Sequence, residues 1–443
     1  MKHYSTPVLV LVAGFMLLSL TTYGQDGATT VYYEGKAYIF GGATDIFGKP
    51  VPSNQMKTFD PKTDQVSHFQ TDNTWPEPRT GHSSCQSQDG SKFYIFGGKN
   101  EKGEYLNDLW EFDLRTLFWK KLNPTNNPLN RINQVQVSIG NILYVAGGST
   151  SAGTSLSDVY SIDITNPVAW TAKAPLPEGL QSSGVLTFNG KMIVYGGFLD
   201  DYDNTIPGKQ MSVNRYAMQY TPGTNEWTML TSQGERELYD FAWTTGANGD
   251  FWVWGGCSYN YDTGNPVIEN GIAVWKPLTN TWTTPVATND LAKTYGGSLV
   301  YVPASGMKTT GKGKLYHIGG MQANGTITER IVEYDLETKI FKEVYTPSGI
   351  DAPFNPGFTM TISPNPAQNS ATIFLTLAKQ NKIFISAYDL SGRMVLNGPL
   401  SQEYASGTHL ITLDISRLAH GMYSIRVATQ EQVVTKKLFV QGQ

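Results

Sequence analysis

The segment Tyr38-Ile39-Phe40-Gly41-Gly42 is a largely apolar strand that ends in two glycines, and the chain contains six segments of this form. The other five copies have the same form and lie at 94–98, 144–148, 193–197, 252–256 and 316–320. Their first glycines are 49 to 64 residues apart. A recurring unit of this size predicts a repeat architecture, such as a solenoid or a propeller. Because glycine permits positive φ and close backbone approach, the pairs mark positions where neighbouring units crowd together.

Each unit continues with a further strand, a turn and an aromatic residue. The six aromatic residues are Phe69, Trp119, Trp170, Trp227, Trp282 and Phe341. These features resemble the kelch repeat, in which about 50 residues fold into one four-stranded propeller blade. The resemblance implies an all-β, six-bladed propeller over 25–346, in which each aromatic side chain fills the wedge between two blades. The first unit is the poorest copy because it lacks the tryptophan.

Turn lengths predict which end of the propeller carries the long loops. The connections at 34–36 and 189–191 are short and contain glycine, as in β-hairpins. The segments after the glycine pairs are long, for example 198–213 and 257–270. Antiparallel alternation places these loops and the blade-to-blade connections on one face, where a rigid scaffold usually presents its binding residues. The sequence leaves open how the ring is closed.

A second domain follows the repeats. The Pro/Gly-rich stretch 347–357 is expected to be a linker, and residues 358–443 contain short alternating strands that predict a small β-sandwich. Its segments 364–366 (Pro-Asn-Pro), 389–393 (Asp-Leu-Ser-Gly-Arg) and 418–423 (Leu-Ala-His-Gly-Met-Tyr) and its basic last strand resemble the type A sorting domain of the Bacteroidetes type IX secretion system. The resemblance implies that the type IX secretion machinery binds this domain as a partner and exports the protein. A generic carbohydrate-binding sandwich is the alternative.

The N-terminus and the charge balance indicate a compartment. Residues 1–24 combine a basic start, an apolar run at 7–20 and small residues near the end, as in a signal peptide. The run is shorter than the roughly 20 residues that span a bilayer, so we expect no transmembrane segment. A net charge of −4 offers no basic surface for nucleic acid. We therefore expect a protein that passes through the periplasm and is secreted or held at the outer-membrane surface.

Cysteine and histidine usage points to neither a disulfide nor a cofactor. Cys85 and Cys257 fall in blades 2 and 5, on opposite sides of a six-bladed ring, whereas a disulfide needs Cα atoms within about 7 Å. Two free, partly buried thiols are the prediction. Galactose-oxidase relatives hold copper on similar propellers, but His68, His82 and His317 are too few for such a site. Packing is the expected role of His82 and His317, and the acidic cluster at 200–204 is only a weak calcium signal.

Charged and aromatic residues of the long-loop face are the candidate site. Those that precede the first strands are Arg79, Arg131, Glu235, Arg236, Glu237 and Lys293. Guanidinium groups that converge there would bind a carboxylate in a bidentate manner, and the alternative is that they tie blades together. Tyrosine rings of the loops offer flat faces to a sugar. The predicted ligand-binding residues are Arg79, Arg131, Arg236, Tyr202, Tyr259 and Tyr261.

These observations predict a secreted, non-catalytic propeller that binds a glycan or a protein outside the cell. The alternative is an enzyme similar to the six-bladed kelch sialic acid mutarotases. In that interpretation Arg236 and Glu237 are the catalytic pair, with Glu237 as acid or base. A structural adhesin is the third interpretation. Convergence of Arg79, Arg131, Arg236 and Glu237 in one pocket would favour the enzyme.

Overall fold

The structure is a computed structural model. It describes residues 27–46, 49–69, 75–199, 212–230, 236–263, 265–304, 313–322, 327–345, 358–389, 394–395, 400–429 and 433–441. The expected signal peptide, the expected linker and the acidic cluster at 200–204 lie outside these residues. Among the described residues, no helix is long and apolar enough to cross a membrane.

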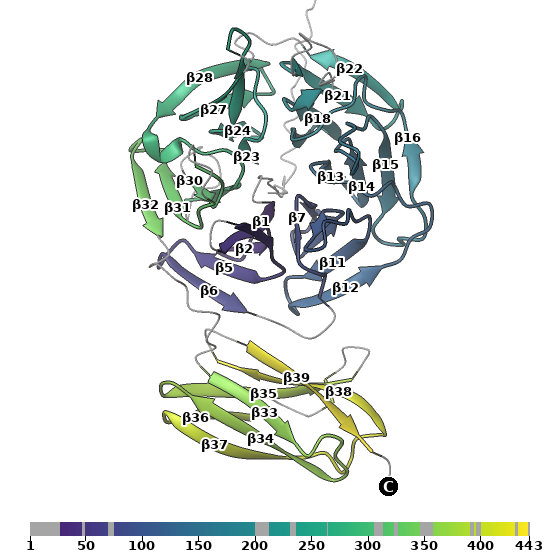
Figure 1. Ribbon diagram of the computed structural model, residues 1–443, viewed down its shortest axis with the longest axis vertical. Helices are drawn as coiled ribbons and strands as arrows, with labels where there is room; N and C mark the ends of the chain where they lie inside the picture. Colours follow the sequence, from purple (N-terminus) through teal and green to yellow (C-terminus); the bar gives the residue numbers. More distant parts are fainter. Residues whose placement is uncertain are drawn as a thin grey trace, which may run out of the picture.

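Six four-stranded antiparallel sheets, the blades, surround a central axis in the described part of the propeller (Figure 1). The four strands of each blade come from one stretch of the chain and are hydrogen-bonded in sequence order. Blade 1 consists of β1 (Ala28–Tyr33), β2 (Lys36–Gly41), β5 (Met56–Asp60) and β6 (Gln65–Phe69). Blade 2 consists of β8 (Ser83–Gln86), β9 (Lys92–Phe96), β11 (Leu109–Asp113) and β12 (Phe118–Leu122). Blade 3 consists of β13 (Val135–Ile139), β14 (Ile142–Ala146), β15 (Val159–Asp163) and β16 (Thr171–Lys173).

Blades 4 to 6 repeat this order. Blade 4 consists of β17 (Gly184–Phe188), β18 (Lys191–Tyr195), β21 (Ala217–Thr221) and β22 (Glu226–Leu230). Blade 5 consists of β23 (Ala242–Thr245), β24 (Phe251–Trp254), β27 (Gly271–Lys276) and β28 (Thr281–Thr288). Blade 6 consists of β29 (Ser298–Pro303), β30 (Gly313–Ile318), β31 (Ile331–Asp335) and β32 (Phe341–Tyr345). A short 3-10 helix, η1 (Asp290–Ala292), precedes blade 6.

The segments after the glycine pairs add small two-stranded sheets. Those in the described residues pair β3 (Ala43–Ile46) with β4 (Lys49–Pro52), β10 (Lys99–Asn100) with β7 (Arg79–Thr80), β19 (Phe198–Leu199) with β20 (Ser212–Val213), and β25 (Cys257–Asn260) with β26 (Asn265–Ile268). Bridges join these segments to the blade-to-blade connections, as between Gln181 and Phe198 and between Tyr239 and Cys257. Both kinds of loop therefore lie on the same face, as the strand alternation predicts.

A backbone chain of hydrogen bonds links the blades next to the first strands. The amide of Asn133 donates to Gly81 (2.9 Å), that of Ser182 to Asn133 (3.0 Å), that of Asp240 to Ser182 (3.3 Å) and that of Gly296 to Asp240 (2.5 Å). All five residues have positive φ, from 49° to 66°. This left-handed conformation points each amide toward the preceding blade. Glycine, Asn and Asp adopt it most readily, which explains most of the residue types at this position.

Aromatic side chains fill the wedges between blades, with one correction to the sequence prediction. The ring of Trp119 in blade 2 packs on Phe40 of blade 1, with ring centroids 4.7 Å apart. Trp119 pairs with Phe112 across strands β12 and β11, and the same register in blade 1 pairs Phe59 with Val66. The prediction of Phe69 as the wedge residue of blade 1 is therefore wrong. The wedge position is set by the register of the strand pairing, which assigns it to Val66 in blade 1.

The ring closes without strand exchange among the described residues, because the four strands of blade 1 all come from 28–69 and the four strands of blade 6 all come from 298–345. β1 packs along β29, and the Ser298 hydroxyl donates to the Ala28 carbonyl (3.1 Å). One apolar core cluster includes Ile39 and Phe59 of blade 1 together with Leu315 and Val332 of blade 6. Apolar packing and side-chain polar contacts therefore hold the two ends of the propeller together.

The C-terminal domain is a two-layer β-sandwich (Figure 1). One sheet has the order β33 (Phe358–Ser363), β34 (Ser370–Leu377) and β37 (Gly407–Asp414), and the other has the order β36 (Leu400–Tyr404), β35 (Asn381–Tyr388), β38 (Gly421–Ala428) and β39 (Val433–Val440). Alternate residues of β34 are buried, and Ile373, Ile385 and Ile425 from both sheets form its core. The sandwich therefore has a core of its own.

Candidate functional site

Arg79 and Arg131 lie at equivalent positions of blades 2 and 3, and neither is exposed. Arg79 donates to both carboxylate oxygens of Asp108, at 2.7 and 3.0 Å, and to the Gly97 carbonyl at 2.9 Å. Arg131 makes the same set of contacts with Asp158 and Gly147. Each guanidinium group therefore braces the strands of its own blade, and its donors are directed at protein acceptors.

Sequence reasoning missed the two aspartates. Asp108 and Asp158 each directly precede the third strand of their blade, β11 and β15. The two blades that have an arginine four residues before the first strand are also the two described blades that have an aspartate directly before the third strand. This co-occurrence was the available signal.

Arg236 and Glu237 lie in the connection that leads into blade 5, and each makes an ion pair with a different partner. Arg236 Nη2 is 2.9 Å from Glu269 Oε2, and Ser258 Oγ donates to the other oxygen of Glu269 at 2.6 Å. Glu237 accepts from Arg215 at 2.9 Å and from the Tyr261 hydroxyl at 2.9 Å. Arg215 and Glu269 were not among the sequence candidates.

These groups form one mixed aromatic and charged area on the long-loop face, which we call the tyrosine–carboxylate surface. Its members are Arg215, Arg236, Glu237, Tyr259, Tyr261 and Glu269. The rings of Tyr259 and Tyr261 meet edge to face with centroids 5.2 Å apart. The Tyr261 side chain is 42% exposed, and the Arg215 side chain is 54% exposed. The predicted residues Arg236, Tyr259 and Tyr261 thus lie in one region, whereas Tyr202 lies outside the described residues.

The Tyr261 phenol on this surface is a hydrogen-bond donor beside a carboxylate acceptor. Burial, the hydrogen bond to Glu237 and the charge of Glu237 all raise the pKa of Tyr261 above its usual value. The phenol therefore stays protonated and donates to the carboxylate. Arg215 and Arg236 are cations, so the surface presents both signs of charge beside an exposed ring.

Beneath this surface lies a buried apolar cluster that supports it. Cys257, Tyr239 and Val213 form its core, and Phe198 packs edge to face on Tyr239 with centroids 5.5 Å apart. The cluster joins the β19–β20 and β25–β26 hairpins to the connections between blades. The hairpin that carries Tyr259 is therefore anchored on a packed base.

Both cysteines are buried, and so are His82 and His317, the two histidines for which packing is the expected role. Cys85 and Cys257 are free, as predicted, and burial is the first cause that raises the pKa of each thiol to about 12. His317 stacks on Trp254 with centroids 5.4 Å apart, and His82 meets Phe40 edge to face at the same distance. Burial lowers the pKa of both imidazoles to about 3. Within the described ranges, no group of three or more His, Cys, Asp or Glu residues is arranged to hold a metal ion.

Repeated glycine-marked blades around an axis, followed by a separate sandwich, define a kelch-type propeller joined to a C-terminal accessory domain. Comparison with protein families agrees with this assignment. Residues 27–236 match the KLHDC2/KLHL20/DRC7 Kelch-repeats domain, and residues 361–441 match the Secretion system C-terminal sorting domain. The chain therefore carries a kelch-repeat domain and a secretion-system sorting domain.

Curated relatives resemble the propeller part. Kelch domain-containing protein 3 of Rattus norvegicus is 27% identical over 228 residues, which cover 48% of this chain and 56% of the relative. The Bos taurus protein of the same name is 29% identical over 40% of this chain and 48% of its own length. Host cell factor homolog hcf-1 of Caenorhabditis elegans is 30% identical over 37% of this chain and 24% of its own length. The matched region spans about half the length of the first two relatives.

The sorting domain carries a functional conclusion of its own. Domains of this kind direct their cargo to the type IX secretion machinery, so its presence indicates secretion across the outer membrane. The generic carbohydrate-binding sandwich considered from the sequence is not needed to explain this domain.

Proposed function

We propose that this protein is a secreted, non-catalytic kelch propeller that binds an extracellular glycan or protein through the tyrosine–carboxylate surface. The observation that carries the proposal is the exposed Tyr261 ring, which lies between its edge-to-face partner Tyr259 and the Glu237–Arg215 ion pair. An exposed tyrosine combines an apolar face with a polar tip, which is the reason that such residues are enriched in binding interfaces.

The chemistry of this surface suits a hydroxyl-rich ligand in particular. Carboxylates of Glu237 and Glu269 accept hydrogen bonds from hydroxyl groups, and the guanidinium groups beside them donate. The Tyr261 ring supplies the flat apolar area on which the carbon face of a sugar ring packs. Export places the propeller where such ligands are met, at the outer-membrane surface or beyond it.

The mutarotase-like alternative has less support from the geometry. It called for Arg79, Arg131, Arg236 and Glu237 in one pocket. Instead the four side chains take part in four separate ion pairs, with Asp108, Asp158, Glu269 and Arg215 as their partners. The guanidinium groups of Arg79 and Arg131 are also fully buried. We therefore place the ligand on the tyrosine–carboxylate surface and propose no reaction there.

A glycan array probed with the purified mature protein tests the proposal. We expect binding to a restricted set of glycans, which the Tyr261→Ala variant loses. Ile340→Ala is the control, because Ile340 is 61% exposed and lies at the turn before β32, away from the long loops. An NMR anomerisation assay with sialic acid is run in parallel. A faster anomerisation in the presence of the protein contradicts the non-catalytic assignment. If no glycan binds, protein ligands are tested next, with Tyr261→Ala and Ile340→Ala compared in the same way.

A further inference from the structure

Blade 2 presents a row of polar side chains to blade 3 near the face opposite the long loops, which we call the tight-turn face. In the strand register, Glu111 of β11 lies between Tyr94 of β9 and Lys120 of β12. The Glu111 carboxylate accepts hydrogen bonds from Lys92 Nζ, at 2.7 Å, and from the Tyr94 hydroxyl. Its side chain is 11% exposed, whereas Lys120 is exposed to solvent. Glu111 therefore has its cation partner in Lys92.

Blade 6 repeats this row toward blade 1. Glu333 of β31 lies between Tyr316 of β30 and Lys342 of β32. Its carboxylate accepts from Lys314 Nζ and from the Tyr316 hydroxyl, both at 2.7 Å. The other four blades have neither a carboxylate nor a lysine at the register positions of Glu333 and Lys342. The seam between blades 6 and 1, the reference seam, can therefore be compared directly with the seam between blades 2 and 3.

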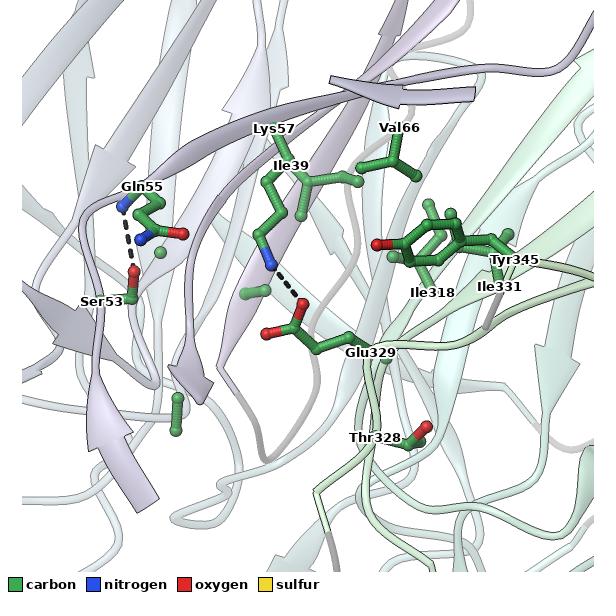
Figure 2. Close-up of a pocket in the computed structure, with 14 residues that line it drawn as sticks. Ile39, Ser53, Gln55, Lys57, Val66, Ile318, Thr328, Glu329, Ile331 and Tyr345 are labelled. Atoms are coloured by element: carbon green, nitrogen blue, oxygen red, sulfur yellow. Dashed lines mark hydrogen bonds and ion pairs between the residues drawn. The ribbon is translucent and has the colours of Figure 1, made fainter. Parts of the chain in front are cut away.

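The chain itself closes the reference seam. Lys342 Nζ lies 3.1 Å from Asp64 Oδ2, and Asp64 belongs to the turn that follows β5 in blade 1. Nearer the long loops, Lys57 Nζ meets Glu329 Oε2 at 2.6 Å in the same seam (Figure 2). The lysine of the row thus obtains a carboxylate partner from the neighbouring blade.

The seam between blades 2 and 3 lacks this carboxylate. The corresponding turn of blade 3, at 164–168, has the sequence Ile-Thr-Asn-Pro-Val and contains no acidic residue. Within the described ranges, the Lys120 side chain makes no ion pair and no hydrogen bond. Lys120 therefore has no counter-charge from blade 3, although its equivalent Lys342 has one from blade 1.

A cleft of about 670 Å³, the blade 2–3 cleft, opens at this place, and Lys120 is one of its lining residues. Leu122 and Ile164 supply apolar lining, while Gln88 and Asn141 supply side-chain amides. The volume lies in the range of sites that hold small ligands. Side-chain amides both donate and accept hydrogen bonds, as a peptide backbone does. The cleft therefore has room and polar groups for a short peptide segment.

The charges that line this cleft leave one cation without a partner. Glu111 pairs with Lys92 at 2.7 Å, and Asp89 pairs at 2.9 Å with Arg115, which lies outside the lining. Lys120 is the remaining charged residue of the lining. Because the walls displace part of the solvent, its attraction for an anion exceeds that on an open surface. The cleft therefore favours a ligand that carries a negative charge.

We propose that the blade 2–3 cleft binds an acidic segment of an extracellular protein, with an aspartate side chain of that segment on Lys120. The aspartate takes the position that Asp64 occupies on Lys342 in the reference seam. A polypeptide turn carries the carboxylate there, which is the reason that we assign a protein segment and not a free small acid. Gln88 and Asn141 hydrogen-bond the backbone of the segment.

This inference is separate from the proposed function. The tyrosine–carboxylate surface lies on the long loops of blades 4 and 5, whereas the blade 2–3 cleft opens near the tight-turn face. Tyr261→Ala is therefore expected to keep the acidic segment bound. Failure of one proposal leaves the other intact.

An array of acetylated and amidated pentapeptides with a central aspartate tests the proposal. Each peptide is accompanied by a counterpart with a central asparagine, and the flanking residues are varied. The array is probed with the purified mature full-length protein. We expect a subset of aspartate peptides to bind, each at least tenfold more tightly than its counterpart in isothermal titration. Absence of any bound aspartate peptide overturns the proposal, as does equal affinity for the two members of each pair.

A pair of lysine variants places the peptide on the protein. Lys120→Met is expected to bind the tightest aspartate peptide at least tenfold more weakly. Lys121→Met is the matched control, because Lys121 is the next residue of β12 and lies on its other face, with Nζ 5.6 Å from the Trp110 ring centroid. Wild-type affinity in Lys120→Met contradicts the proposal, and so does an equal loss in both variants. Thermal unfolding checks that both variants are folded.

A third arm separates a protein segment from a free acid. Succinate is titrated into the wild type under the same conditions, and we expect it to bind at least tenfold more weakly than the tightest peptide, because it lacks the backbone groups. Succinate that binds as tightly as the peptide overturns the assignment to a protein segment.

Discussion

Arg79 in blade 2 holds Asp108 of the same blade by two hydrogen bonds, of 2.7 and 3.0 Å, at a site where the arginine is completely buried. The pair connects the chain before the first strand to the chain before the third strand. Arg131 and Asp158 repeat it in blade 3. These pairs thus stabilise the scaffold that carries the long loops.

Removal of Arg79 is expected to destabilise the propeller strongly. Arg79→Met leaves the Asp108 carboxylate, whose side chain is 15% exposed, without its cation. Loss of one partner of a buried pair costs about 3–5 kcal/mol. Urea unfolding followed by tryptophan fluorescence measures this, since all ten tryptophans lie in the propeller.

Two companion variants sharpen this test. Arg79→Met with Asp108→Asn is expected to recover part of the loss, because no unpaired charge remains while Asn keeps an acceptor for the Trp110 indole. Arg115→Ala breaks an exposed pair with Asp89, and we expect it to leave the free energy of unfolding almost unchanged because solvent screens such a pair. Equal effects of Arg79→Met and Arg115→Ala would contradict the structural role of the buried pair.

Acid is expected to destabilise the propeller through His82. Burial and then the charge of Arg79 lower the pKa of this imidazole to about 3, from 6.5 in an unfolded chain. Between these values the unfolded state binds a proton that the folded state does not, so stability falls as the pH drops from about 6.5 toward 3. The slope is at most about 1.4 kcal/mol per pH unit for one histidine.

The variant His82→Gln isolates this contribution. Its free energy of unfolding is expected to fall less steeply than that of the wild type between pH 6 and pH 4, whatever its absolute stability. Carboxylates titrate equally in both proteins and drop out of the difference. Parallel curves for the two proteins across this window would mean that His82 does not stay neutral in the fold.

The glycine pairs are expected to tolerate no side chain. Gly147 has a φ of 65°, and a Cβ there would lie 2.5 Å from the Leu180 carbonyl oxygen. Gly147→Ala should therefore lower the free energy of unfolding by more than about 2 kcal/mol, since the left-handed conformation alone costs about 1–2 kcal/mol.

Two further glycines separate the causes. Gly153 has positive φ but open space around it, so Gly153→Ala reports the conformational penalty alone. Gly223 has open space and no positive φ, and Gly223→Ala should change stability by no more than about 0.5 kcal/mol. The expected order of loss is Gly147, then Gly153, then Gly223, as measured by urea unfolding. Any other order would contradict the explanation that close backbone approach requires glycine at the paired positions.

Tyr261 is expected to dominate ligand binding on the tyrosine–carboxylate surface. Tyr261→Ala should weaken a glycan identified on the array by at least about tenfold, which corresponds to 1.4 kcal/mol. Tyr261→Phe retains the ring and loses the hydrogen bonds of the hydroxyl, including the one to Glu237, so a smaller loss is expected. Titration of both variants checks this order. A loss in Phe as large as that in Ala would assign the effect to the hydroxyl instead of the ring.

Local sequence chemistry predicted the blades and most of the candidate surface. These signals are the glycine pairs, the short hairpin turns and the alternating strands. Each depends on only a few neighbouring residues, so each can be recognised without knowledge of the fold. The same reasoning assigned the long loops to one face and selected Arg236, Tyr259 and Tyr261. It missed Arg215 and Glu269, because their partners come from other loops.

The wedge residue of blade 1 shows the limit of this reasoning. Phe69 is the aromatic residue that a pattern search finds, but the pairing of Phe59 with Val66 places valine at the wedge. Composition cannot reveal a register, since it depends on hydrogen bonds between strands. Likewise Arg79 and Arg131 appeared as binding residues, and in the fold both are buried and paired with aspartates of their own blades.

By itself the sequence determined that this chain builds six kelch blades and a sorting domain, because period, glycine position and strand alternation are local properties. Only the tertiary structure decided how the ring closes, which charges pair and where a cavity remains. Those outcomes depend on contacts between residues far apart in the chain, such as the ion pair of Lys57 in blade 1 with Glu329 beside blade 6. Such contacts exist only after the blades have packed together.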